Sequence, residues 1–211
     1  MKVDYIEHMG DDNRVANAAR VSFDKEASNY TPEQNDKLLA YLARHNHWTP
    51  FSHPQITLRY TVPIFVARQE FKHIVGFTRN EVSRRYVDDE PEFFVPEVWR
   101  SRPQGSVKQG SGYKAIDQLS LQSLYETVCA SSQDAYNLAL ELGAAPEQAR
   151  MMLPQSMYTS YYITGSLAAF ARFYKQRTDE HAQKEIQDLA HMVGDIIQPL
   201  FPVSWEALTG A

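Results

Sequence analysis

The chain has 211 residues, of which 43% are hydrophobic, and its 21 basic and 26 acidic side chains give a net charge of −5. This length and apolar content suit a single domain with a sizeable core, and the negative charge argues against a protein that coats nucleic acid. The one cysteine, Cys129, excludes an internal disulfide and a thiolate metal cluster. Without signal-peptide character or an apolar run of about 20 residues, the protein is expected in the cytoplasm, or in the host cytoplasm if it is viral.

The first strong helix signal covers residues 31–46. Thr31 and Gln34 have the spacing of a capping box, Pro32 stands at the first helical position, and leucines follow at helical spacing. Residues 55–62 then alternate between polar and apolar side chains, which predicts a strand with one buried face.

A helix is expected over residues 64–74, with Ile64, Ala67 and Phe71 facing inward. The other side of this helix carries polar residues, namely Arg68, Gln69, Lys72 and His73. A second strand is predicted over residues 82–87.

The second half of the chain begins with a segment rich in Gly, Ser, Gln and Pro, residues 101–113, which predicts a mobile surface loop. The elements expected after it are a long helix over 114–142, a short helix from Pro146, a strand over 156–164, and helices over 165–176 and 179–198. Together these elements predict an α+β fold: a modest, mostly antiparallel sheet with long packed helices in a single domain of residues 1–211. No Gly-x-Gly-x-x-Gly motif follows a strand, so no Rossmann fold is expected.

Positive charge is concentrated in residues 68–86, where five basic and two acidic side chains give a net charge of +3. Such a segment in an acidic protein suits a small anionic ligand better than a polymer, since arginine binds phosphate through two parallel hydrogen bonds. A solvated helix face with ordinary ion pairs is the alternative, because Glu70 and Glu81 neutralise part of the charge.

Two other groups of residues have candidate chemistry. His45, His47 and His53 invite a zinc hypothesis, but their spacing matches no standard metal site, so no metal is predicted. Cys129 lies on the predicted apolar helix near Glu126, a setting that favours packing over nucleophilic catalysis.

Several stretches taken together resemble the flavin-dependent thymidylate synthases, and they occur in the same order over nearly the whole chain. They are AARVSF (18–23), HWTPFSH (47–53), PIFVARQ (63–69), NEVSRRY (80–86), ARMMLP (149–154) and RTDEHAQKEIQ (177–187).

The chain departs from the signature of that family, which reads Arg-His-Arg, seven residues, Ser, one residue, Arg. Here the first part is Lys72-His73-Ile74, and eight residues then precede Ser83. Lysine retains the charge of the first arginine but not its planar fork, and isoleucine replaces the second arginine. The extra residue leads to the hypothesis that Arg79 substitutes for the missing arginine in the flavin site.

The resemblance implies reductive methylation of dUMP to dTMP, with methylenetetrahydrofolate as carbon donor and FAD reduced by NADPH as hydride source. It also implies a homotetramer whose active sites are shared between subunits, with no nucleic-acid or membrane partner. A flavin in a groove between subunits would need no Rossmann fingerprint. Because Cys129 is a poor nucleophile here, the uracil is expected to be activated electrostatically, and the resemblance assigns this catalytic role to Arg177.

The resemblance also implies the remaining site residues, none of which binds a metal. Those expected to bind dUMP are Gln69, Lys72, Glu81, Ser83, Arg84, Arg85, Arg150 and Arg177. Those expected to bind FAD are Ser22, His47, Thr49, Lys72, His73, Ile74, Asn80, Glu81, Ser166 and Arg172.

Two functions of other classes remain as alternatives. A catalytically inert flavin- or nucleotide-binding module would show flavin absorption without thymidylate formation. A small nucleic-acid-binding protein would use residues 68–86, but the net charge of −5 and the absence of a recognisable nucleic-acid motif weigh against it.

Overall fold

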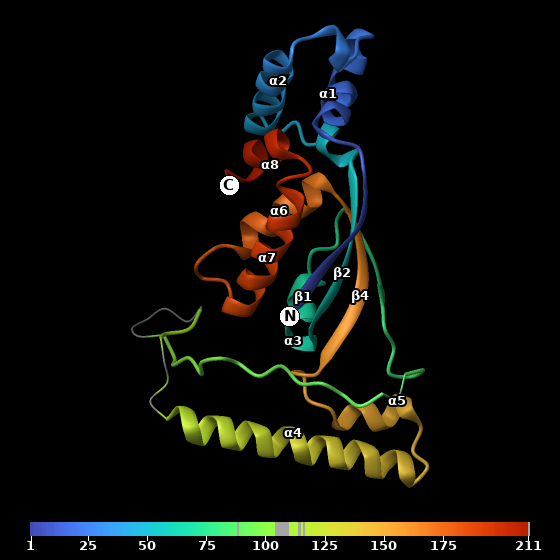
Figure 1. Cartoon of the computed structure of the whole chain (residues 1–211), viewed down its shortest axis with the longest axis vertical. Coiled ribbons are helices and arrows are strands. Elements are labelled where there is room, and N and C mark those ends of the chain that lie inside the picture. The colour runs from blue at the N-terminus through green and yellow to red at the C-terminus, as the bar shows by residue number, and fades with distance from the viewer. Residues whose placement is uncertain (88, 104–109, 114, 116, 211) are drawn as a thin grey trace.

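The computed structural model describes residues 1–87, 89–103, 110–113, 115 and 117–210 (Figure 1). Its strands are β1 (Lys2–Met9), β2 (Gln55–Pro63), β3 (Phe77–Glu81) and β4 (Tyr158–Ser166). Its α-helices are α1 (Asp12–Arg20), α2 (Pro32–Arg44), α3 (Ile64–Glu70), α4 (Gln118–Glu141), α5 (Pro146–Ala149), α6 (Leu167–Arg177), α7 (Lys184–Ile197) and α8 (Pro202–Thr209). The predicted α+β class is confirmed.

The four strands form one antiparallel sheet in the order β1-β2-β4-β3. Along β2, the apolar residues Ile56, Leu58, Tyr60 and Val62 are fully buried, whereas the residues between them are at least partly exposed. The alternation of apolar and polar residues therefore predicted both the strand and its buried face correctly.

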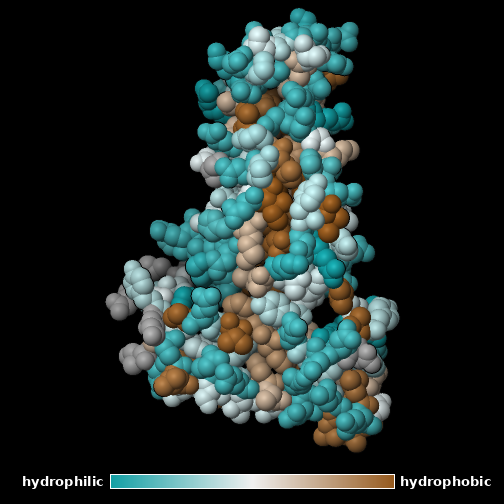
Figure 2. All heavy atoms as spheres, in the orientation of Figure 1, coloured by the Kyte–Doolittle hydropathy of each residue, from teal (hydrophilic) through white to brown (hydrophobic). Residues whose placement is uncertain are grey.

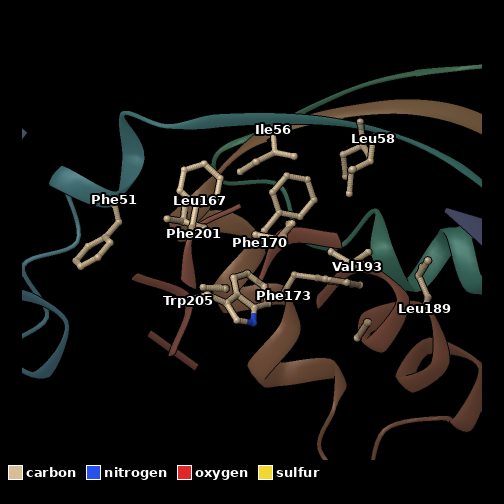
Figure 3. Close-up of a cluster of buried hydrophobic side chains, with 14 of the residues drawn as sticks. Phe51, Ile56, Leu58, Leu167, Phe170, Phe173, Leu189, Val193, Phe201 and Trp205 are labelled. Carbon is tan, nitrogen blue, oxygen red and sulfur yellow. The ribbon is translucent and has the colours of Figure 1, made fainter. Parts of the chain in front are cut away.

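Helices α6 and α7 cover the buried face of the sheet, and α8 packs against α6 and α2 (Figure 1). Figure 3 shows Ile56 and Leu58 of β2 facing aromatic side chains that include Phe170 and Phe173 of α6 and Trp205 of α8. These residues are fully or almost fully buried and form the main core. Helix α6 is thereby fixed against the sheet along its length, which gives its C-terminal residues a defined position.

The start of α2 agrees with the prediction. Thr31 accepts a hydrogen bond from the backbone N–H of Gln34, and the Gln34 side chain accepts one from the N–H of Thr31. Pro32 is the first residue of the helix. The capping box and the proline thus identified this helix from sequence alone.

The strand predicted over residues 82–87 is wrong, because β3 occupies Phe77–Glu81 and the chain turns immediately afterwards. The register of β3 is set by β4, with Phe77 opposite Gly165 and Glu81 opposite Tyr161. A Cβ atom at Gly165 would lie 2.3 Å from the Phe77 ring, so only glycine lets this pairing form. The residues around β3 in the sequence could not indicate this contact, because Gly165 lies far away in the chain.

Other boundaries also differ from the sequence-based expectations. The helix expected over 64–74 ends at Glu70, and β1, α1 and α8 were not predicted. Strand β1 is a mostly exposed edge strand, so it lacks the clear alternation of a half-buried strand.

Helix α4 lies across one end of the molecule, apart from the helices that cover the sheet (Figure 1). It packs against α5 and the 3-10 turn η4 (Arg150–Met152), and several of its leucines are largely exposed, with Leu119 at 85% and Leu124 at 62%. Figure 2 shows brown, apolar side chains on the surface at this end. The long helix is confirmed, but within one chain its apolar residues form only a small core cluster.

Two sequence predictions fall partly outside the described residues. The loop expected to be mobile, 101–113, includes residues 104–109, and the helix expected from 114 includes residues 114 and 116. Among the helices that the structure describes, none is both long and apolar enough to cross a membrane.

Candidate functional site

The segment that links α3 to β3, residues 71–76, is called here the signature loop. Arginines hold it from two sides. From α6, Arg172 donates to the carbonyl oxygen of Val75, and Arg177 donates to the carbonyl oxygen of Gln69 at 3.2 Å, just before the loop. From β3, Arg79 donates to the carbonyl oxygen of His73 at 2.6 Å. The loop conformation therefore depends on side chains that follow it in the sequence.

His73 is the buried residue of the signature loop, with 8% of its surface exposed. Its Nε2 atom lies 2.8 Å from Nε of Arg177, and its ring meets Phe173 edge-on at 5.1 Å. Arginine donates hydrogen bonds and accepts none, so Nε2 of His73 must be the unprotonated acceptor. Burial lowers the pKa of His73 to about 4, and the charges of Arg177, Arg172 and Arg79 act in the same direction.

Arg79 makes an ion pair with Glu70 beneath the signature loop. Its Nε and Nη2 atoms donate to the two carboxylate oxygens at 2.9 and 2.5 Å, and Glu70 is only 1% exposed. The Tyr161 hydroxyl also donates to this carboxylate, at 3.1 Å. Burial raises the pKa of Glu70, although the hydrogen bonds from Arg79 and Tyr161 oppose that shift.

This placement bears on the hypothesis that Arg79 replaces the missing signature arginine in the flavin site. The guanidinium is directed inward, toward Glu70 and the rings of Phe71 and Phe77, which lie 5.4 and 4.9 Å away. The structure therefore gives Arg79 partners within the protein and does not support a direct contact with flavin.

A cavity of about 460 Å³ lies beside the start of α6. It is lined by Ser166 and Arg172 of the predicted flavin set, together with Trp48 and Gly76, and His47 and Thr49 flank Trp48 in the chain. At Gly76, φ is +83° and a Cβ atom would lie 2.9 Å from Cβ of Ala169, so this close approach requires glycine.

The lining of this cavity suits a planar, anionic cofactor. Trp48, 61% exposed, offers an aromatic surface, and Arg172 and Lys175 offer positive charge. The donors and the aromatic ring fit part of an FAD molecule, and the cavity is too small for the whole dinucleotide. Ile74 precedes Val75, which lines the cavity, and is 73% exposed. Ser22 and Asn80 are also exposed, but they do not line the cavity.

A second cavity, of about 410 Å³, contains two residues of the predicted nucleotide set. Lys72 and Glu81 line it together with Arg68. Glu81 accepts a hydrogen bond from the Thr159 hydroxyl at 2.7 Å. Nearby in the sequence, the Gln69 side chain donates to Gln183 at 2.7 Å. Sequence reasoning placed Arg68 in the basic segment but did not assign it to the nucleotide site.

The remaining predicted nucleotide ligands lie in two other places. Ser83, Arg84 and Arg85 follow β3 in a turn, where Ser83 Oγ accepts from the backbone N–H and from Nε of Arg85, both at 3.3 Å. Arg150 lies in η4, which packs against α4 and α5, and it donates to the carbonyl oxygen of Glu147. Within one chain, Arg177 and Gln69 thus lie beside the signature loop, which contains Lys72 and His73. Arg150 lies on a different part of the fold.

Potential metal ligands do not cluster in the part of the chain that the structure describes. Among the described residues there is no group of three or more His, Cys, Asp or Glu side chains that could hold a metal ion. Cys129 is buried on α4, as its apolar setting in the sequence predicts.

Comparison with known proteins gives a match to the family described as thymidylate synthase complementing protein, over residues 4–203. A flavin-dependent thymidylate synthase of Thermosipho africanus is 38% identical over 209 residues, which cover 96% of this chain and 88% of that protein. The enzyme of the same name from Kosmotoga olearia is 39% identical over 204 residues, covering 96% of this chain and 87% of its relative. That of Thermus thermophilus is 36% identical over 202 residues, covering 96% of this chain and 73% of its relative.

Two solved structures of PolB from Streptomyces cacaoi, a UMP/dUMP methylase, have the same fold. The complex with 5-Br dUMP has a TM-score of 0.89 at 29% identity, and the alignment covers 99% of this chain and 94% of that one. The complex with 5-Br UMP has a TM-score of 0.87 at 28% identity, covering 99% and 93%.

The neutral state of His73 predicts a pH dependence of stability. Between pH 6.5 and about 4 the unfolded chain protonates this histidine while the folded chain does not, so its contribution to stability is lost as the pH falls. We expect the free energy of unfolding of the wild type to fall across this range by roughly 1–2 kcal/mol more than that of His73→Gln, which does not titrate. Above pH 7 the difference between the two proteins should be constant.

Chemical denaturation at a series of pH values and one protein concentration would measure this difference. The same dependence on pH in both proteins would contradict a buried, neutral His73.

Proposed function

The chain belongs to the family of flavin-dependent thymidylate synthases, which are enzymes, and we propose that it methylates dUMP to dTMP with methylenetetrahydrofolate as carbon donor and NADPH-reduced FAD as hydride source. The family match supports this proposal over nearly the whole chain. The cytoplasm, where soluble nucleotides and NADPH are available, is the proposed location.

The chemical problem is to make carbon 5 of the uracil ring attack a one-carbon unit. A cysteine that adds to the ring is one solution, but Cys129 is buried on α4, at the end of the molecule away from the helices that cover the sheet. A bound reduced flavin supplies the reducing chemistry, and the protein then has to hold and polarise the nucleotide.

The observation that carries the proposal is the orientation of Arg177. Its Nε is fixed by neutral His73 and one Nη2 donor by the carbonyl of Gln69. These bonds use two of the five N–H donors of the guanidinium. The others can donate to the carbonyl oxygens of a uracil, where positive charge favours the electron-rich ring that attacks. Partial burial of Arg177 strengthens this interaction, because water screens it less.

The cofactor and the nucleotide have separate groups of candidate ligands. Ser166 and Arg172, with the segment around Trp48, would hold flavin, since they line the 460 Å³ cavity. Lys72 and Glu81, which line the second cavity, would bind the nucleotide near Arg177. Ser83, Arg84, Arg85 and Arg150 are proposed for its phosphate and sugar.

The positions of these candidate ligands favour a homotetramer with shared active sites. Arg150 lies in η4, which packs against α4 and α5 rather than against the signature loop, so a site containing it is more readily completed by another subunit. Large apolar side chains are exposed in the signature loop and on α4, including Ile74 at 73%, Val75 at 71% and Leu124 at 62%. Contact between subunits would bury these surfaces.

Replacing the catalytic arginine tests the assigned role. We expect Arg177→Ala to retain its assembly and bound flavin, because Arg177 lies neither on α4 nor in the lining of the 460 Å³ cavity, and to form dTMP at least about a thousand-fold more slowly. Coupled measurement of NADPH oxidation and dTMP formation, with flavin absorbance of the purified protein, gives both quantities.

The same experiment addresses the inert-module alternative. Normal turnover by Arg177→Ala would contradict its role. Flavin absorbance without dTMP formation in the wild type would instead support a catalytically inert flavin-binding module.

The exposed face of α4 predicts the effect of charged residues on assembly. Leu124 and Leu138 lie fourteen residues apart and are 62% and 53% exposed, so they share one face of the helix. We expect Leu124→Glu/Leu138→Glu to reduce the molecular mass measured by analytical ultracentrifugation and to reduce activity with it, because buried charges oppose association. Glu126→Ala is the control, because Glu126 is exposed on the same helix but is two residues from Leu124 and so lies on a different face, and it should leave the mass unchanged. A tetramer in both variants would exclude this face from the interface.

UMP is a second candidate substrate, because PolB, with a TM-score of 0.89 to this chain, is described as a UMP/dUMP methylase. Identities of 36–39% to the thymidylate synthases, against 28–29% to PolB, favour dUMP. A deoxyribose pocket leaves the 2′-hydroxyl of UMP without a partner, at a cost of about 1–3 kcal/mol. We therefore expect methylation of UMP to be at least about ten-fold slower than that of dUMP in initial-rate assays. Equal rates would favour the wider activity.

A further inference from the structure

We propose that the buried ion pair of Glu70 and Arg79 positions Arg177 for methylation, acting through His73. This inference rests on the proposed function, in which Arg177 activates the uracil. Arg79 lies in the stretch where the chain departs from the family signature and Glu70 lies two residues before it, and neither residue is expected to touch substrate or flavin.

The first step is the pair itself. Two guanidinium nitrogens of Arg79 donate to the two oxygens of Glu70, at 2.9 and 2.5 Å, and the exposed side-chain fractions are 13% for Arg79 and 1% for Glu70. Tyr161 donates a further hydrogen bond to the carboxylate. A pair at such depth has little freedom to move, because either charge left alone would be strongly destabilised.

The second step connects the pair to the signature loop. Nη2 of Arg79, besides binding Glu70, donates to the carbonyl oxygen of His73 at 2.6 Å. The backbone N–H of His73 donates to the carbonyl of Glu70 at 3.0 Å. The backbone of His73 is therefore held through both its carbonyl and its N–H by the two residues of the pair.

The third step connects the loop to the catalytic arginine. Because the backbone of His73 is held from below, its ring has a defined place against Phe173, and Nε2 is presented to Nε of Arg177 at 2.8 Å. Nδ1 then carries the ring proton, since Nε2 accepts. Glu70 also balances the positive charge that Arg79, Arg172 and Arg177 bring to this region.

This arrangement accounts for the extra residue in the signature through the position of Arg79 on β3. With eight residues between Ile74 and Ser83, Arg79 falls on the same side of β3 as Phe77, facing the sheet's buried side, while Thr78 and Asn80 are exposed. At that position its guanidinium reaches Glu70. The chain thus supports the loop from beneath by an internal arginine where the usual signature has an arginine in the loop itself.

A double-mutant cycle between Arg79 and His73 tests the proposal. The variants are Arg79→Met, His73→Ala and the two combined, measured for kcat and KM with dUMP, flavin affinity and thermal unfolding. If Arg79 acts through His73, Arg79→Met should lower kcat at least about ten-fold in the wild type, change KM by less than about two-fold, and lower kcat by less than about two-fold once His73 is absent. Flavin affinity of Arg79→Met should stay within about two-fold of the wild type, because Arg79 is directed toward Glu70 and away from the flavin cavity.

Loss of stability alone has to be separated from loss of positioning. Asp12→Ala is the matched control: Asp12 accepts hydrogen bonds from the backbone N–H groups of Val203 and Ser204 at the start of α8, so its loss should lower the unfolding temperature without changing kcat. If Arg79→Met does not fold, Glu70→Gln/Arg79→Met replaces it, because that variant leaves no unpaired buried charge.

Three results would overturn the proposal: unchanged kcat in the Arg79 variant, equal losses of kcat with and without His73, or a fall in kcat for Asp12→Ala as large as that for Arg79→Met. Failure of the proposed function is a different result, since the wild type itself would then form no dTMP.

Discussion

The hydrogen bond between Arg177 and the neutral ring of His73 is the contact on which the arrangement of the site depends. It joins the end of α6, which is fixed against the sheet by the core, to a loop that has no regular structure of its own. Because arginine cannot accept a hydrogen bond, this contact exists only while the imidazole is unprotonated. Burial and three nearby guanidinium groups keep it in that state. The site therefore places a cation against a neutral acceptor and leaves much of the cation's hydrogen-bonding capacity for a ligand.

The rest of the fold serves to bring together segments distant in the sequence. The pairing of β3 with β4 places Arg79 beneath the loop, and the packing of α6 places Arg172 and Arg177 beside it. Of the residues proposed to bind nucleotide and flavin, one chain brings only some together in this way. Arg150 and the exposed apolar residues of α4 lie elsewhere, and this division is the physical reason to propose a shared site in a tetramer.

The elements that were predicted correctly from the sequence are those whose patterns involve only neighbouring residues. Helix α2 with its capping box, strand β2 with its alternation, and helices α6 and α7 were predicted because each depends on neighbouring residues. Strand β3 was misplaced because its register depends on Gly165, almost ninety residues away. The edge strand β1 gave no clear signal because most of it is exposed.

The sequence predicted which residues belong to the candidate site but not the contacts that join them. The resemblance to a family drew attention to His73, Arg172 and Arg177, and the structure brings all three to the signature loop. The sequence alone did not indicate that Glu70 pairs with Arg79. It showed Glu70 only as one of two acidic residues that neutralise part of the charge of a basic segment. Their pairing depends on the bend of the chain between α3 and β3, which follows from packing rather than from local pattern.

The protonation state of His73 is the most direct test of this account. Nitrogen-15 NMR of protein labelled at histidine, with His73→Gln to assign the signal, reports the charge and the tautomer of the ring. We expect a neutral ring with its proton on Nδ1 at pH 7, and no protonation of Nε2 until the pH falls to about 4. A ring that is doubly protonated at pH 6, or that carries its proton on Nε2, would contradict it.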